Sequence, residues 1–433
     1  MDAEPNVLRD HSAPEPSPGH ASQVAVVLHD GFFGASSGTG FSNRAFLEAL
    51  ALALPPGSLS VFPTQVPAGH AGFDRAWARQ TRELLNRACA KVVPLPFPHL
   101  ENANVHDSEA LCQITGTVIA DESMTPRHVI ALDIPFLGLA PHLDTVGSSL
   151  LLVPRSTSLL VDPEDHARTL WEREGLAASV VRGGTVGAIS QHMRAHLRDE
   201  YAIPGAALID LPNGLIPTDH TMPSESVPLP PRARGGFLFA MGRAVESKGF
   251  EDLIDALVIL RDRRADIPHL VLAATSSSED PTPYQDRLRE RLRAGGVDAT
   301  VFSRFSPVYR TWLRSPALRA VIVPSRAEAF GRIPLEAFSA GAAPVVATRV
   351  GGLAETVFDD VTGYTAEPRN PHDLAAAIHR ALGAMAHERE RLRQQGQYLL
   401  SRCHNYETTI HKYVREHLPW ALQPDSAERS LPR

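Results

Sequence analysis

Short apolar runs alternate with longer amphipathic segments along most of the 433-residue chain. Apolar runs of about 4–8 residues are typical of buried parallel strands, and the longer segments are typical of the helices that cover them. In the first half we predict strands at 23–29, 60–64, 91–95, 117–121, 128–133, 150–153, 186–190 and 208–211, and helices most clearly at 43–54, 74–89 and 191–200. A second series of strands is predicted at 237–242, 270–275, 300–303, 320–323 and 344–347. The pattern predicts an α/β protein with two Rossmann-like domains built from βαβ units.

A proline-rich stretch with little periodicity separates the two series of strands. We therefore predict a first domain at 22–215, a hinge at 216–235 and a second domain at 236–400. Residues 1–21 are rich in Pro, Glu and His and lack an apolar stretch, so they are predicted to be a disordered tail and not a signal peptide. A second tail is predicted at 422–433, after a strongly helical, charged segment at 388–418.

The overall charge of the chain argues against certain classes of binding partner. With 42 Lys and Arg against 49 Asp and Glu, the chain is mildly acidic, which argues against a nucleic acid or an anionic membrane surface as partner. The three cysteines are scattered without metal-ligand or disulfide spacing, which favours a cytoplasmic protein. No apolar stretch approaches the roughly 18 residues of a membrane span. We expect a protein without stable membrane insertion.

Two glutamates, Glu328 and Glu336, lie between the end of one predicted strand and the first turn of a helix. Ligands of open α/β sheets bind at the carboxyl ends of the strands, where helix N-termini offer free N–H groups. Carboxylates placed there accept hydrogen bonds from sugar or ribose hydroxyls. The alternative is that both glutamates only cap the helix.

Two further loops of the second domain carry complementary chemistry. The turn from Gly242 to Gly249 holds Arg243 and Lys248 at a predicted helix N-terminus, which is the composition of a diphosphate clamp. Seen alone, it would be an ordinary loop with solvated basic residues. A glycine-containing loop at 351–355 follows the fifth strand. Together the three loops predict a site for a ligand with sugar hydroxyls and a diphosphate.

These motifs resemble those of retaining glycosyltransferases with the GT-B fold, in the large group 1 (family 4-like) class that carries a Glu-x7-Glu motif. The resemblance is strong over about residues 236–385 and thinner in the first half. It implies two domains that face a cleft, and a helix at 401–421 that returns to the first domain. The matching segments are Gly242-Arg243, Ser247-Lys248-Gly249, Pro324-Ser325, Phe330-Gly331, Pro344–Thr348, Gly351–Glu355, Val361–Tyr364, Asp373–Ala376, Gly38–Gly40, Ser190 and Pro212–Gly214.

The resemblance also implies roles for individual residues. Arg243 and Lys248 would neutralise the leaving nucleoside diphosphate without a metal ion. Glu328 would contact the transferred sugar, and Glu336 would accept hydrogen bonds from the ribose hydroxyls. The backbone would approach the donor closely at Gly38, Gly40, Gly242, Phe330 and Gly331.

The first domain departs from the family pattern at the acceptor side. The family usually has a His after the strand at 150–153, whereas this chain has Arg155 or Ser156 there. The other acceptor-side candidates are His29, Asp133 and His142. For each a structural role is the alternative, because a strand-end Asp often caps a helix and a single His is usually structural or solvated. The 19 histidines form no metal-ligand spacing, so neither a metal nor a cofactor is expected.

The sequence thus predicts a retaining glycosyltransferase that moves a sugar from a nucleotide sugar, most simply a UDP-sugar, to a hydroxyl of a small soluble acceptor such as an aminocyclitol or another secondary metabolite. Two alternatives stay open. One is an epimerase of the same fold that acts on a nucleotide-linked amino sugar. The other is a non-catalytic protein that binds nucleotide sugars.

Overall fold

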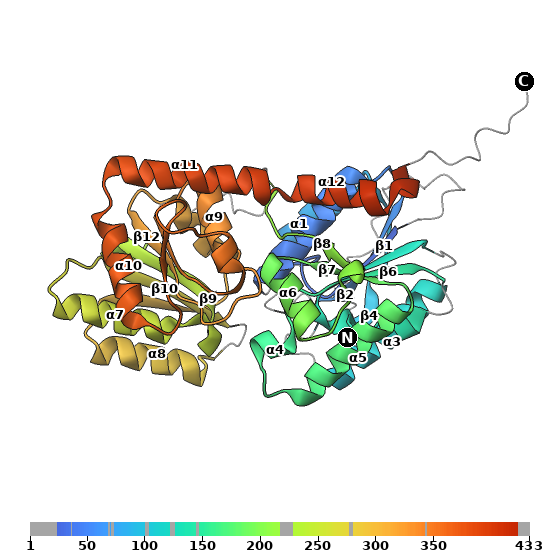
Figure 1. Cartoon of the computed structure of the whole chain (residues 1–433), viewed down its shortest axis with the longest axis horizontal. Helices are drawn as coiled ribbons and strands as arrows, with labels where there is room; N and C mark the ends of the chain where they lie inside the picture. The colour runs from blue at the N-terminus through green and yellow to red at the C-terminus, as the bar shows by residue number, and fades with distance from the viewer. Residues whose placement is uncertain are drawn as a thin grey trace, which may run out of the picture.

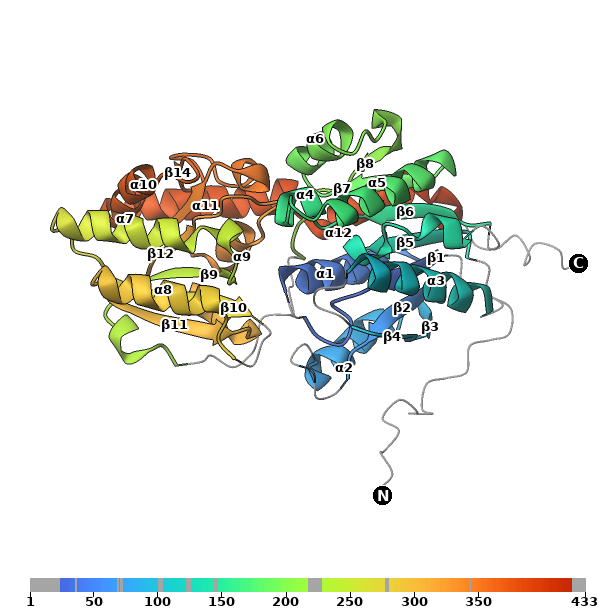
Figure 2. The ribbon, with the colours of Figure 1, turned by 90° about the horizontal axis from the view of Figure 1, so that it is seen from below.

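The computed structural model describes residues 24–35, 37–67, 70, 73–99, 104–121, 126–143, 147–216, 228–276, 280–342 and 344–422. The predicted tail at 1–21, all but the first residue of the tail at 422–433, and residues 217–227 of the predicted hinge lie outside these ranges. The described chain forms two separate α/β units that lie side by side in Figures 1 and 2.

The first unit is a parallel sheet with strand order β3-β2-β1-β5-β6-β7-β8, and β4 pairs with β2. Every residue of β1 and β5 is buried, which explains why these strands read as continuous apolar runs. The strands are β1 (Val24–Leu28), β2 (Leu59–Gln65), β3 (Cys89–Val92), β4 (Leu95–Pro98), β5 (His128–Leu132), β6 (Ser149–Val153), β7 (Thr185–Ala188) and β8 (Leu208–Asp210). The helices are α1 (Gly38–Ala53), α2 (Arg75–Leu85), α3 (Val105–Asp121), α4 (Ser158–Val161), α5 (His166–Val181) and α6 (Gln191–Asp199).

One predicted strand of this unit is wrong. Residues 117–121 form the last turn and a half of α3 and not a strand. The buried residues Leu111, Thr115 and Ile119 recur at every fourth position, which places them on one face of a helix. The β-branched pair Val118-Ile119 resembles a strand only when it is read apart from the helix that precedes it.

The second unit is a parallel sheet with strand order β11-β10-β9-β12-β13-β14. Its last strand, β14, has only three residues and was not predicted. The strands are β9 (Phe237–Arg243), β10 (His269–Ser276), β11 (Ala299–Arg304), β12 (Leu318–Val323), β13 (Val345–Thr348) and β14 (Tyr364–Ala366). The helices are α7 (Phe250–Asp262), α8 (Pro283–Ala294), α9 (Ile333–Ala340) and α10 (Pro371–Gly383).

The helical segment predicted at 388–418 is two helices, α11 (Ala386–Cys403) and α12 (Tyr406–His417), which run end to end along both units in Figure 1. Helix α12 packs against α1, so the predicted return of the chain to the first domain is confirmed. At the break between the two helices the chain pairs with the end of the first unit. Leu215 N donates to His404 O over 2.9 Å, and Tyr406 N donates to Leu215 O over 3.0 Å.

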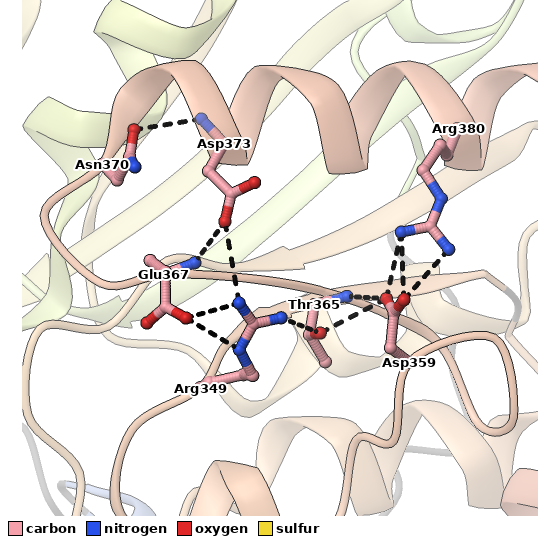
Figure 3. A network of polar contacts seen from close by, with 7 residues as sticks. All are labelled: Arg349, Asp359, Thr365, Glu367, Asn370, Asp373 and Arg380. Carbon is pink, nitrogen blue, oxygen red and sulfur yellow. Dashed lines mark hydrogen bonds and ion pairs between the residues drawn. The ribbon is translucent and has the colours of Figure 1, made fainter.

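A network of charged and polar side chains ties the outer strand β14 to helix α10 (Figure 3). The guanidinium of Arg380 donates to both carboxylate oxygens of Asp359 over 3.1 Å. Thr365 N donates to the same carboxylate over 2.8 Å, and Arg349 donates to Thr365 Oγ1 over 2.8 Å. These bonds hold together the edge of the second unit that carries the motif residues 361–364 and 373–376. The other residues drawn are Glu367, Asn370 and Asp373.

Candidate active site

A cavity lies between the two units and is lined by both of them. The second unit contributes the ends of β9 and β10, the loops that follow β9 and β12, and the segment after β11. The first unit contributes the start of α1 and the loop after β6. The polar and glycine residues of the lining that bear on function are Ser37, Gly38, Ser42, Arg155, Asn213, Gly242, Arg243, Lys248, Glu328, Gly331, Arg332 and Glu336.

The turn between β9 and α7 is built to hold its basic residues against the loop after β12. Gly249 has φ 64° and precedes α7, and a side chain there would run into the carbonyl oxygen of Pro324. Ser247 O accepts a hydrogen bond from Arg326 N over 2.7 Å, which fixes the two loops together. Only glycine allows both the left-handed backbone and this close approach. The predicted clamp and the predicted carboxylates therefore share one rigid wall of the cavity.

Lys248 and Glu328 form an ion pair in this wall. Lys248 Nζ lies 2.5 Å from Glu328 Oε2, and each side chain is 16% exposed. Ser325 Oγ donates to the same carboxylate oxygen over 3.2 Å. An ammonium group has three N–H donors, so Lys248 keeps donors for a ligand phosphate.

Arg243 differs from Lys248 because it is exposed at the end of β9. Among the described residues, no hydrogen bond or ion pair engages its guanidinium group. An unpaired guanidinium that lines a cavity is suited to bind an incoming phosphate. The cavity is thus lined by two cations, Lys248, which is paired with Glu328, and Arg243, which has no such partner among the described residues.

Glu336 lies in the first turn of α9 and is buried between two arginines. Its Oε1 lies 3.2 Å from Arg332 Nε, and its Oε2 lies 3.2 Å from Arg310 Nε. Arg332 is four residues before Glu336, so the spacing of a helix turn could have indicated this pair. Arg310 comes from the 3-10 helix Pro307–Arg314, and no short-range pattern indicates its contact with Glu336.

The first-unit wall of the cavity begins at helix α1. Ser37 caps this helix by accepting a hydrogen bond from Thr39 N over 3.2 Å. Gly38 and Gly40, which were expected to approach the donor, lie in the first turn of this helix. Gly38 lines the cavity, whereas Gly40 packs against Asp30 and is absent from the lining residues that the structure describes.

Arg155 and Ser156, the two residues predicted at the departure from the family pattern, both line the cavity after β6. The guanidinium of Arg155 is buried and donates to Asn43 Oδ1 over 2.9 Å, Asn213 Oδ1 over 3.0 Å and Tyr406 Oη over 2.8 Å. These neutral acceptors come from α1, the segment after β8 and α12. Arg155 therefore ties three elements together in the first-unit wall of the cavity.

The other three acceptor-side candidates are absent from the cavity lining over the residues described. His29 stacks on His99 with a ring separation of 4.2 Å, and burial lowers the pKa of His29 well below its usual value. Asp133 accepts a hydrogen bond from Ile134 N over 2.8 Å, and burial raises the pKa of Asp133 to about 6. His142 contacts Glu109 over 2.9 Å, away from the cavity. Their predicted acceptor-side roles stay predictions.

Glu355 of the 351–355 loop contacts the first unit and not the cavity. Its two carboxylate oxygens accept from Gln191 N over 2.9 Å and from His192 N over 2.7 Å, at the N-terminus of α6. Beside it, Ser190 Oγ donates to Ala329 O over 2.8 Å. A carboxylate at a helix N-terminus is stabilised by the helix dipole and the free N–H groups. Glu355 therefore helps to join the two units.

In the part of the chain that the structure describes, no helix is long and apolar enough to cross a membrane. Over the same residues, no three His, Cys, Asp or Glu side chains are grouped so that they could hold a metal ion.

Comparison with known proteins supports the assignment suggested by these loops. The family model "Glycosyl transferases group 1" matches residues 225–398, which contain Arg243, Lys248, Glu328 and Glu336. The match covers most of the second unit and none of the first unit. The matched segment contains the second-unit residues that line the cavity and were predicted to bind the donor.

Two curated relatives illustrate the range of the family. The chain is 37% identical to D-inositol 3-phosphate glycosyltransferase of Arthrobacter sp. (strain FB24) over 153 residues, which is 34% of each chain. It is 34% identical to glycogen synthase of Mycobacterium tuberculosis (strain CDC 1551 / Oshkosh) over 175 residues, which is 40% of each chain. The matches thus span well under half the length of these two relatives.

Solved structures resemble the chain over both units. Sucrose-phosphate synthase from Thermosynechococcus elongatus superposes with a TM-score of 0.71 at 19% identity, over 92% of this chain and 98% of that one. The Anabaena protein HepE in complex with UDP and glucose superposes with a TM-score of 0.67 at 16% identity, over 92% and 99% of the two chains. This similarity shows that the chain has the GT-B fold, as predicted.

Proposed function

We propose that the protein is a retaining glycosyltransferase that transfers a sugar from a nucleotide-sugar donor to a hydroxyl group of an acceptor. The observation that carries the proposal is the convergence of two cations and two carboxylates, Arg243 and Lys248 with Glu328 and Glu336, on one cavity between the two units. All four lie in the segment that matches the group 1 family. Retention of configuration is taken from the family resemblance.

In the proposed reaction the bond between the sugar C1 and the diphosphate oxygen breaks, and a bond between C1 and the acceptor oxygen forms on the same face. The diphosphate leaves with the bonding electron pair, and the acceptor hydroxyl gives its proton to the departing phosphate. Arg243 and Lys248 stabilise the charge that develops on the diphosphate. In this proposal Glu328, which contacts Lys248 and Ser325, binds the sugar, and Glu336 accepts hydrogen bonds from the ribose hydroxyls.

We further propose a UDP-sugar as donor and a small soluble acceptor, such as an aminocyclitol. The donor proposal is supported by the structural neighbour in complex with UDP and glucose. The acceptor proposal draws on the mild acidity of the chain and on the relative named D-inositol 3-phosphate glycosyltransferase, since an inositol is a cyclitol. The relatives named for glycogen and lipopolysaccharide indicate how widely acceptors vary in this family.

The test is a thermal-shift screen of UDP, GDP, ADP and their glucose derivatives, followed by NMR of the tightest donor with and without candidate cyclitols. We expect a bound nucleotide sugar that is consumed when an acceptor is present, with the α-anomeric configuration kept in the product. Inversion of a ring carbon of the donor without any acceptor would indicate the epimerase instead. Binding without hydrolysis or transfer to any acceptor would indicate a non-catalytic binding protein.

A further inference from the structure

The two arginines that hold Glu336 also contact helix α1 of the opposite unit. Arg332 Nη1 donates to Ser42 Oγ over 3.1 Å, and the Arg310 guanidinium lies 4.4 Å from the centre of the Phe41 ring. We propose that Arg310 and Arg332 are positioning residues that orient Glu336 for the nucleotide ribose when Phe41 and Ser42 are docked against them. This proposal rests on the proposed function, since it assumes a nucleotide donor.

The arginines fix the carboxylate without occupying all of it. Each oxygen of Glu336 has one arginine nitrogen at 3.2 Å, and all three side chains are 9% exposed or less. A carboxylate offers about four acceptor sites, so each oxygen keeps one for a ribose hydroxyl. The arrangement prepares Glu336 to accept two neighbouring hydroxyl groups.

Helix stability does not account for Arg332. It is the N-cap residue of α9, and a positive charge there faces the positive end of the helix dipole. The order Arg332 then Glu336 is also the less favourable direction for a helical ion pair. Besides Glu336, the guanidinium contacts two residues of the opposite unit, Ser42 Oγ over 3.1 Å and the Phe41 ring at 5.9 Å from its centre. Ser42 Oγ also accepts from Asn213 Nδ2 over 3.2 Å. The position of Arg332 is thus explained by the contact between the units.

Arg310 makes the second link through an aromatic ring. Phe41 is 4% exposed and packs edge-on against Trp77 of its own unit with ring centres 5.1 Å apart. Phe305 of the opposite unit lies 6.3 Å from the same ring. A guanidinium over a desolvated ring is attracted by the ring quadrupole. If α1 moves away, Arg310 loses the ring and Arg332 loses Ser42, so both supports of Glu336 loosen together.

The consequence is a reciprocal coupling between nucleotide binding and docking of α1. A nucleotide whose ribose hydroxyls donate to Glu336 favours the state in which Phe41 and Ser42 contact Arg310 and Arg332. Substitutions of Phe41 or Ser42 weaken that nucleotide through Glu336, even though they leave Glu336 unchanged.

The experiment measures binding of UDP and of 2′,3′-dideoxy-UDP by calorimetry to the full-length chain and its variants. We expect Arg332→Met to weaken UDP about tenfold, Ser42→Ala to weaken it about threefold, and both to leave dideoxy-UDP nearly unchanged. Arg332→Lys, which keeps the charge, should recover part of the affinity. In a Glu336→Gln background, Ser42→Ala should have no further effect on UDP.

Leu52→Ala is the matched control, because Leu52 lies on α1 and is 49% exposed. It should bind both nucleotides as the wild type does. Equal losses of UDP and dideoxy-UDP in Arg332→Met would overturn the positioning role, as would a full Ser42→Ala effect in the Glu336→Gln background. If the wild type binds none of UDP, GDP and ADP, the proposed function itself fails, and this inference fails with it.

Discussion

The ammonium group of Lys248 lies 2.5 Å from the carboxylate of Glu328, and each of these side chains is only 16% exposed. The pair joins the turn after β9 to the loop after β12, the two segments that were predicted to bind the diphosphate and the sugar. A ligand phosphate at this wall therefore meets a cation that is already held in place by a carboxylate. Catalysis by such pre-oriented charges needs no rearrangement at the moment of reaction.

Lys248→Met should lower turnover by about 10²–10³-fold, because the variant keeps the side-chain stem but loses the charge that stabilises the leaving diphosphate. The melting temperature should fall because Glu328, which is only 16% exposed, loses its partner, but the protein should stay folded at the assay temperature. Turnover with the donor found in the nucleotide screen, together with a thermal melt, checks both statements. Turnover like that of the wild type would remove Lys248 from the mechanism.

Arg243→Ala should weaken donor binding and lower turnover without a measurable change in melting temperature. The guanidinium is exposed and makes no contact with the described residues that the substitution would break. Arg263→Ala is the matched control, because Arg263 is exposed at the end of α7, away from the cavity. The idea of a clamp fails if the two variants have the same donor dissociation constant.

Glu355→Gln should speed up amide hydrogen exchange at Gln191 and His192, because the carboxylate that accepts from these two N–H groups loses its charge. We expect a cost of about 1 kcal/mol at the helix N-terminus. Glu200→Gln at the other end of α6 is the control and should leave both amides protected. Unchanged protection in Glu355→Gln would show that the contact does not hold the units together.

Asp133→Asn should stabilise the protein more at pH 8 than at pH 4. Burial raises the pKa of Asp133 to about 6 in the folded protein, so the folded state binds this proton more tightly than the unfolded state does. The stability contribution of the protonated group is present below the unfolded pKa of about 4 and is lost as the pH rises through about 6. The loss is at most about 3 kcal/mol.

Urea unfolding of the wild type and of Asp133→Asn at both pH values measures this difference. Asp133 also has a positive φ of 93°, and any relief of backbone strain by Asn is independent of pH. A stabilisation of equal size at pH 4 and pH 8 would therefore assign the effect to the backbone and not to the charge.

Site residues that lie in a loop directly after a strand could be predicted from the sequence. Lys248 and Glu328 each lie five residues after the end of a strand, β9 and β12, and shortly before a glycine. The carboxyl ends of the strands of one parallel sheet lie at the same edge of the sheet. The common position of Lys248 and Glu328 at the cavity follows from that rule. The helix predicted beside Glu336 is α9, and it ends at Gly341, which has the left-handed conformation typical of a helix C-terminus.

Contacts that depend on how the two units dock could not be predicted in this way. Arg332 and Ser42 are 290 positions apart, and Arg155 and Tyr406 are 251 positions apart. Neither contact leaves a periodic signal in the sequence. The sequence identified Arg155 only as one of two residues, with Ser156, at a departure from the family pattern. The hydrogen bond between Arg155 and Tyr406 requires the complete fold.

The hydrogen-bonded crossing of Leu215 with His404 and Tyr406 has a practical consequence for recombining this protein with its relatives. The chain leaves the first unit at Leu215 and returns to it at His404–Tyr406, and these two segments are hydrogen-bonded to each other. A chimera that exchanged only the residues after Leu215 would pair the native Leu215 with a segment from the relative. A chimera that replaces the family-matched segment should therefore take residues 213–216 and 404–406 from the same parent protein. The two segments should therefore be exchanged together whenever one unit is replaced.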